Sequence, residues 1–144
     1  MDRRGETGGP AVIVADTSLI ASLLLPGPNN GIAEKVLRKD PEWVAPGLWR
    51  YEFMNVLATQ VRVAGAPVDN AISYFEKAEE IVLPGPVEAP AAEVLRLAAE
   101  RRLTAYDAQF LAMALTLDVT LVTFDRAIVA ASGGRAVSPL SFAS

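Results

Sequence analysis

The sequence predicts an α/β fold in which helices cover both faces of a mainly parallel sheet, and two patterns lead to that prediction. Short apolar runs rich in Val, Ile and Ala recur along the chain, as in AVIVAD (residues 11–16) and VTLVTFD (residues 119–125). Segments with helical apolar spacing separate these runs, and such alternation is typical of a parallel sheet covered on both sides. The length of 144 residues fits one domain with a single core.

The N-terminal half contains two predicted strands and three predicted helices. AVIVAD has no polar residue before Asp16, which indicates a buried strand, and TSLIASLLL follows it at helical spacing. Pro41 ends the second helix and Gly65 ends the third. The predicted order is strand 11–16, helix 17–25, helix 32–40, strand 43–46 and helix 48–65.

The C-terminal half continues the alternation. Asp69 is expected to cap the next helix, and Pro84 is expected to end the strand that follows it. AVSPL (residues 136–140) is expected to form a last edge strand. The predicted order is helix 66–80, strand 81–84, helices 91–102 and 104–118, strand 119–125, helix 126–132 and strand 136–140.

Residues 1–10, MDRRGETGGP, precede the predicted domain, which spans residues 11–144. This segment has two Arg but no apolar stretch, so it is expected to be a disordered tail and neither a signal peptide nor a membrane anchor. No apolar run approaches membrane-spanning length, so we expect a soluble cytoplasmic protein. The hydrophobic content of 51% suggests one further buried face, either a homodimer interface or a groove for a partner.

The absence of two residue types limits the chemistry. The chain has no Cys, which excludes disulfides and thiolate zinc sites, and no His, which excludes histidine-based triads and imidazole ligands. Catalysis must therefore use carboxylates, hydroxyls, Lys, Arg or a metal ion held by oxygen ligands. Such ligands suit Mg²⁺ or Mn²⁺.

The net charge of −4 argues weakly against a nucleic-acid binder, because such domains are typically basic. The argument weakens further if four of the acids bind metal. Setting aside Asp16, Glu52, Asp107 and Asp125 leaves 13 of the 17 acids, which equals the 13 Lys and Arg. The charge that a phosphate backbone meets would then be close to neutral.

These four acids are predicted to converge. Asp16 and Asp125 follow strands, whereas Glu52 and Asp107 lie in the first turns of helices. In a parallel α/β sheet the carboxyl ends of strands and the amino ends of helices meet at one edge, where ligands bind at a switch in strand order.

Each acid also has a purely structural explanation. Asp16 and Asp125 are suitable helix N-caps, and Thr104-x-x-Asp107 has a spacing close to that of a capping box. Glu52 complements the dipole of its helix. Taken singly, the structural interpretation is the stronger one for each.

The apolar surroundings favour a joint role. Asp107 shares a helical stripe with Leu111 and Ala114, and Asp16 closes an apolar strand, so both are expected to point inward. A buried carboxylate without a cation or donors costs several kcal/mol or becomes protonated, and a metal ion resolves that cost. Asn55 and Thr59 continue the polar stripe of Glu52, as supporting residues would. This chemistry favours metal-assisted phosphodiester hydrolysis.

Four segments together resemble a known family. VIVADTSLI, WRYEFMNVL, LTAYDAQFLAMA and TLVTFD, in that order and spacing, resemble the PIN-domain ribonucleases, and most closely the VapC-type toxins of prokaryotic toxin–antitoxin pairs. The resemblance runs from about Val12 to Ser138, and the TAYDA segment followed by LVTFD is its most specific part.

The resemblance implies a three-layer α/β/α Rossmann-like fold and an endoribonuclease that depends on Mg²⁺ or Mn²⁺. It also implies a homodimer held inactive by a cognate antitoxin. The acidic quartet of the family falls on Asp16, Glu52, Asp107 and Asp125. Asp16 and Asp107 would be direct ligands, and Glu52 and Asp125 would bind a second ion or orient waters. Three hydroxyl residues would hold ligands or waters: Thr17, Ser18 and Thr123.

Arg126 and Arg50 are the basic residues expected to contact the RNA backbone, and Arg126 directly follows a site acid. Trp43 and Trp49 are expected to be packing residues in preference to base-stacking ones.

Two other functions stay open. An aspartyl-phosphate phosphotransferase is disfavoured because Thr17 and Ser18 follow Asp16 and no Lys follows Lys77. A PIN-like module that binds RNA or an antitoxin without cleavage is compatible with the same residues.

Overall fold

The computed structural model describes residues 12–144, so the expected tail at residues 1–10 lies outside the described residues. At its centre is a sheet of five parallel strands in the order β3-β2-β1-β4-β5. The strands are β1 (Val12–Ala15), β2 (Glu42–Ala45), β3 (Val82–Pro84), β4 (Thr120–Val122) and β5 (Ala136–Val137). The predicted α/β fold with a parallel sheet is therefore confirmed.

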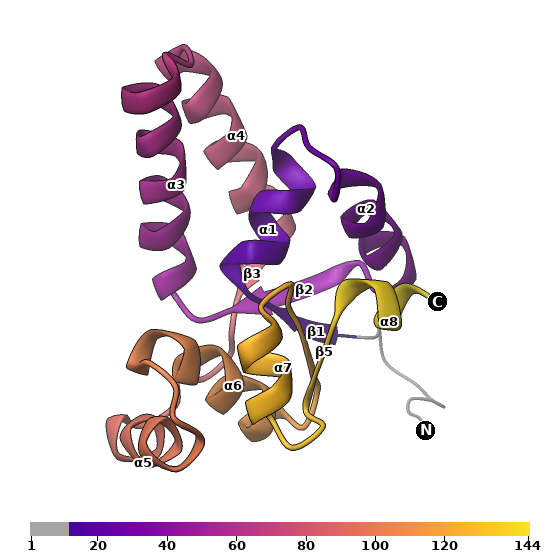
Figure 1. Cartoon of the computed structure of the whole chain (residues 1–144), viewed down its shortest axis with the longest axis vertical. Coiled ribbons are helices and arrows are strands. Elements are labelled where there is room, and N and C mark those ends of the chain that lie inside the picture. Colours follow the sequence, from indigo (N-terminus) through magenta and orange to yellow (C-terminus); the bar gives the residue numbers. More distant parts are fainter. Residues whose placement is uncertain (1–11) are drawn as a thin grey trace.

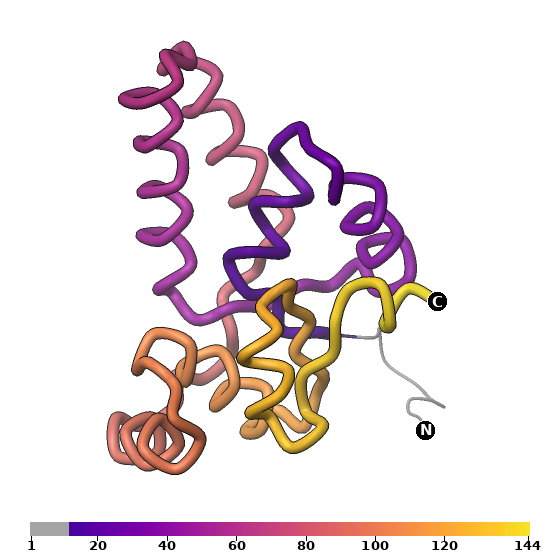
Figure 2. The backbone as a smooth tube through the Cα atoms, in the orientation of Figure 1, coloured from indigo at the N-terminus to yellow at the C-terminus, as the bar shows by residue number. Residues whose placement is uncertain are grey.

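Helices cover both sides of this sheet. Figure 1 shows α1 to α4 on one side and α5 to α7 on the other, with α3 and α4 extending beyond the sheet as an antiparallel pair. The path of the backbone is easiest to follow in the tube of Figure 2. The helices are α1 (Thr17–Leu24), α2 (Asn30–Lys39), α3 (Leu48–Ala64), α4 (Val68–Ile81), α5 (Ala91–Arg101), α6 (Ala105–Leu117), α7 (Arg126–Ala131) and α8 (Pro139–Ala143).

The strand order places a switch point beside β1. The chain adds β2 and β3 on one side of β1, then crosses over to add β4 and β5 on the other. Ala15 at the end of β1 pairs with Val122 at the end of β4, so these two strands end level with each other. The residues that follow them, Asp16 and Thr123, are therefore neighbours at the edge where α/β sheets bind ligands.

The core lies between the sheet and its helices, and both tryptophans belong to it. Trp43 is fully buried in β2, where its indole N–H donates to the Asp40 carbonyl at 2.9 Å. Trp49 is buried in α3 and stacks on Phe75 of α4, with ring centroids 5.7 Å apart. The expectation that both residues pack is therefore confirmed, and neither ring is free to stack on a base.

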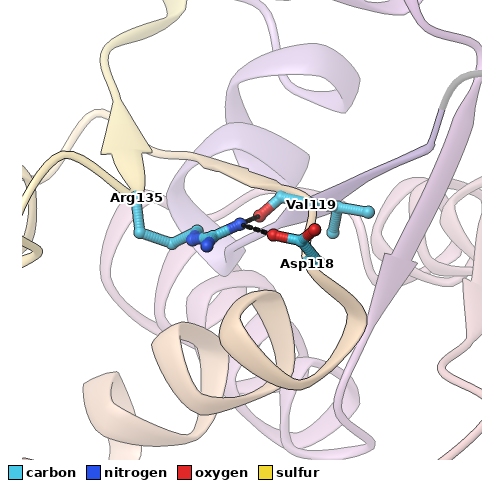
Figure 3. Close-up of polar contacts among 3 residues, drawn as sticks. All are labelled: Asp118, Val119 and Arg135. Carbon is cyan, nitrogen blue, oxygen red and sulfur yellow. Dashed lines mark hydrogen bonds and ion pairs between the residues drawn. The ribbon is translucent and has the colours of Figure 1, made fainter. Parts of the chain in front are cut away.

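An ion pair between Arg135 and Asp118 lies directly before the edge strand β5. The Arg135 guanidinium donates to Asp118 Oδ1 at 2.9 Å and to the Val119 carbonyl at 3.3 Å, as Figure 3 shows. Asp118 ends α6 in the left-handed conformation and Val119 leads into β4. This contact therefore connects the residue before β5 with the two residues before β4.

The structure differs from the sequence prediction at three element ends. The AVSPL segment forms only a two-residue strand, because Ser138 caps a new helix with Pro139 in its first turn. Pro67, not Asp69, occupies the cap position of α4. The strand predicted at residues 119–125 ends at Val122. By contrast, Gly65 ends α3 with φ +71°, as predicted.

Among residues 12–144, every helix is too short or too polar to cross a membrane.

Candidate functional site

Asp16 is the most deeply buried acid at this edge of the sheet, with an exposed fraction of 6%. It caps α1, because Oδ1 accepts a hydrogen bond from the Leu19 amide at 3.1 Å. Oδ1 also accepts from the Ser18 hydroxyl at 2.7 Å, and Oδ2 accepts from the Thr123 hydroxyl at 2.6 Å. The N-cap interpretation of Asp16 is therefore correct, but capping uses only part of its hydrogen-bonding capacity.

Burial raises the pKa of Asp16 from 3.8 to about 6. The hydrogen bonds from Thr123, Ser18 and Leu19 oppose this rise because they stabilise the ionised form, whereas the negative charge of Asp125 adds to it. Removal from water is the largest cause. A cation beside Asp16 would reverse that penalty.

The segment after β4, residues 123–125, forms the other side of the site. Thr123 Oγ1 accepts a hydrogen bond from the Asp125 amide at 2.9 Å while it donates to Asp16. The Phe124 amide donates to the Ser18 hydroxyl at 3.1 Å. Asp125 Oδ1 caps α7 by accepting from the amides of Ala127 and Ile128. One hydrogen-bonded network thus joins the ends of β1 and β4.

Glu52 enters this site from α3. Its Oε1 accepts a hydrogen bond from the Thr17 hydroxyl at 2.6 Å, and Thr17 directly follows Asp16 in the chain. Glu52 is the fifth residue of α3. This helix lies on the same side of the sheet as α1 (Figure 1). The contact therefore joins Glu52 to the first residue of α1, which directly follows Asp16, the N-cap of that helix.

Asp107 lies in the first turn of α6, on the opposite side of the sheet. Thr104 caps this helix by accepting from the Asp107 amide at 3.0 Å, as the sequence spacing predicted. Partial burial raises the pKa of Asp107, and the charge of Asp125 raises it further. Asp125 therefore acts electrostatically on both Asp16 and Asp107.

The four predicted acids thus gather at one edge, although not as a closed cage. Across residues 12–144, no three Asp, Glu, Cys or His side chains form a group that could hold a metal ion by themselves. Asp16, Glu52 and Asp125 each accept hydrogen bonds from hydroxyl or amide groups. The donor set still suits Mg²⁺, which usually keeps several waters and takes one or two carboxylates from the protein.

The remaining predicted residues are exposed or make contacts outside this network. Asn55 is exposed, and Thr59 donates to the Asn55 carbonyl at 2.8 Å, so its hydroxyl is turned to its own helix. Arg50 pairs with Glu79 of α4 and lies over the Phe75 ring, 5.2 Å from its centroid. An RNA contact by Arg50 would have to break that pair. Arg126 is exposed at the start of α7.

Residues of α3 and α4 line a groove of about 640 Å³. Its lining is mainly apolar and includes Met54, Leu57, Val68, Ile72 and Phe75. Val68 and Ile72 are exposed in this single chain, which leaves an apolar surface facing water. The sequence signal for this surface was the high hydrophobic content, which did not give its position.

Comparisons with known proteins were made for the whole chain. The family model described as the PIN domain matches residues 13–133. No curated protein matches the chain.

Solved structures share its fold. The crystal structure of PAE2754 from Pyrobaculum aerophilum is 26% identical with a TM-score of 0.74, covering 92% of this chain and 93% of that one. FitAcB from Neisseria gonorrhoeae is 18% identical with a TM-score of 0.57, covering 89% and 98%. FitAB bound to an IR36 DNA fragment is 18% identical with a TM-score of 0.58, covering 88% and 94%.

The family match includes all four predicted acids and all three hydroxyl residues of the network. PIN domains are generally nucleases, which agrees with the acidic edge built here from β1, α3, α6 and the segment after β4. On its sequence and its fold, this chain belongs to the PIN-domain family.

Proposed function

We propose that this protein is a metal-dependent endoribonuclease that hydrolyses RNA phosphodiester bonds, and that it is the toxin of a toxin–antitoxin pair. The observation that carries the proposal is the position of Asp16. It is a buried carboxylate with a raised pKa at the switch point of the sheet, and the negative charge of Asp125 acts on it and on Asp107. Such an arrangement is unfavourable by itself and becomes favourable around a divalent cation.

The side chains have different tasks in this proposal. Asp16 and Asp107 bind the ion directly, and Glu52 and Asp125 orient waters or bind a second ion. Ser18 and Thr123 hold the Asp16 carboxylate in one orientation through bonds of 2.7 and 2.6 Å.

Thr17 fixes Glu52 through a bond of 2.6 Å. A bound Mg²⁺ or Mn²⁺ would polarise the phosphate and lower the pKa of an attacking water.

RNA cleavage by matched variants tests this activity. Wild type and Asp107→Asn are incubated with a mixed RNA pool in Mg²⁺, in Mn²⁺ and in EDTA, and circular dichroism checks both folds. The proposal expects cleavage by metal-loaded wild type only, because the variant loses one ligand charge. Equal cleavage by both proteins would assign the activity to another site or to a contaminant.

We also propose an antitoxin as the protein partner. The resemblance to VapC-type toxins supports it. The groove lined by α3 and α4 also offers an exposed, mainly apolar surface to which a protein partner could bind. FitAB, whose fold is similar, was solved bound to a DNA fragment. An antitoxin segment with apolar side chains would cover Val68 and Ile72, which a monomer leaves exposed. A homodimer is the second assembly that we propose.

Co-purification tests the antitoxin. The chain is co-expressed with the product of any small open reading frame adjacent to its gene, and the complex is isolated. Ile72→Glu should abolish the complex because it puts a charge in the groove, whereas Leu140→Glu, at an exposed position on α8, should not. Capture by both variants alike would exclude the groove as the docking site.

A second candidate function is a PIN module that binds RNA or an antitoxin without cleaving. One observation favours it, namely that no three carboxylates within residues 12–144 close around a common point. Absence of cleavage under every metal condition, together with retained RNA binding, would support this candidate.

A further inference from the structure

We propose that Tyr51 and Tyr106 bind the substrate of this site by stacking their rings on unpaired RNA bases. This inference rests on the proposed function, because it identifies the ligand as the RNA that the acidic site would cleave. It adds to that function two residues that hold the bases.

Exposure distinguishes these two tyrosines from the other aromatic residues. The chain has ten aromatic residues, and all of them lie within the described part. Eight are buried or half-buried, and several pack on one another, as Trp49, Phe53 and Phe75 do. Of the aromatic residues within positions 12–144, only Tyr51 and Tyr106 are exposed, with exposed fractions of 68% and 60%.

Each exposed tyrosine is the sequence neighbour of a site acid. Tyr51 directly precedes Glu52 in the first turns of α3, and Tyr106 directly precedes Asp107 in the first turn of α6. The two helices lie on opposite sides of the sheet (Figure 1), and each directs its acid to the same edge: Glu52 accepts a hydrogen bond from Thr17, and the charge of Asp125 acts on Asp107. The tyrosines therefore lie one residue before a site acid on helices from both sides of the sheet.

Neither tyrosine ring contributes to the packing of the core. Residues 110–114 of α6 are buried, so that helix already has its core contacts without Tyr106. Tyr51 lies on the exposed side of α3, whereas Trp49 and Phe53 take the buried side. A large ring left in water forgoes the favourable free energy of burial, and a ligand that covers the ring gains it.

The charge of the protein favours stacking over phosphate contacts. The net charge is −4, and four acids surround the site, so the bare surface does not attract a phosphate backbone. Base stacking needs no charge, because every base offers a ring face to an aromatic side chain. Single-stranded RNA offers such faces, because its bases can be splayed out, whereas a duplex hides them.

The test measures binding in the absence of cleavage. Fluorescence anisotropy follows a short labelled single-stranded RNA with the full chain in EDTA, so that metal-dependent hydrolysis cannot occur. The variants are Tyr106→Ala, Tyr106→Phe, Tyr51→Ala and Tyr51→Phe. Leu140→Ala is the control, since it removes an apolar side chain with an exposed fraction of 66% from α8.

We expect each Ala variant to weaken binding by about tenfold and each Phe variant to bind within about twofold of wild type. The RNA affinity of the Leu140→Ala control should equal that of wild type. On an oligonucleotide with the same backbone and abasic sites, the difference between Tyr and Ala should disappear, because no base remains to stack.

Several results would overturn the proposal. They are wild-type affinity in both Ala variants, equal loss in the Phe and Ala variants, or the same loss on the abasic oligonucleotide. Absence of RNA binding by wild type would also overturn it. A change of molecular mass with unchanged RNA binding would assign the rings to a protein interface.

Failure of the nuclease proposal is distinguishable from these results. It would appear as normal binding without cleavage when Mg²⁺ or Mn²⁺ is added.

Discussion

The hydroxyl of Thr123 donates a hydrogen bond of 2.6 Å to Oδ2 of Asp16, although 107 positions separate the two residues. The bond joins the ends of β1 and β4, the two strands on either side of the switch point. It also holds the most buried acid of the site in place, which makes it a structural element of the candidate active site.

Replacement of Thr123 by Val should destabilise the fold. The side chain is fully buried, and its oxygen both donates to Asp16 and accepts from the Asp125 amide. Val keeps the shape but leaves two buried polar groups without this partner, at a cost of about 1–3 kcal/mol. Urea unfolding measures the loss. Thr116→Val, at an exposed position on α6, is the matched control and should stay within about 0.5 kcal/mol of wild type. Equal effects in both variants would show that the Thr123 bond contributes nothing.

The stability of the metal-free protein should fall as the pH rises through the pKa of Asp16. Because the pKa is about 6 in the folded protein and 3.8 ordinarily, the folded state binds the proton more tightly than the unfolded state. This contribution is fully present below pH 3.8 and is lost as the pH rises through 6, a change of about 3 kcal/mol.

Asp16→Asn isolates this contribution, because Asn does not ionise. The stability of the variant relative to wild type should increase between about pH 4 and about pH 7 in EDTA. Urea unfolding at several pH values gives both curves. Parallel curves would mean that Asp16 does not titrate in this range.

Thr17 should be a positioning residue for Glu52. Thr17→Val removes the hydroxyl that donates to Glu52 Oε1 and retains the shape of the side chain. If Glu52 acts in the reaction, RNA cleavage should fall by about tenfold, which corresponds to about 1.4 kcal/mol. Thr17→Ser keeps the donor and should restore most of the activity. A Val variant as active as the Ser variant would remove Thr17 from this role.

The sequence was sufficient to predict the parallel sheet and the position of Asp16 directly after its first strand. The β-branched run before Asp16 and the helical spacing after it correspond to β1 and α1. The run that precedes Asp125 corresponds to β4, although the strand is shorter than predicted. These features depend on local patterns, which a sequence displays directly. The strand predicted at residues 136–140 was partly wrong because Ser138 and Pro139 start a helix there.

Long-range contacts could not be predicted in the same way. The pairing of Thr17 with Glu52 depends on where α3 lies beside α1, which neither segment specifies alone. The same holds for Thr123 and Asp16, and for the pairing of Arg50 with Glu79. Tyr51 and Tyr106 were overlooked because exposure is a property of the folded surface. Their one sequence signal is an aromatic residue directly before each helical site acid.

The most direct test of the metal site measures bound Mn²⁺ and RNA cleavage in the same samples across one Mn²⁺ titration. We predict that both quantities rise along one curve in wild type. In Asp16→Asn, both should shift to a Mn²⁺ concentration higher by about tenfold or more, because a ligand charge is lost. Cleavage that does not follow the bound metal, or an Asp16→Asn curve equal to that of wild type, would contradict the assignment of these carboxylates to a metal-dependent nuclease.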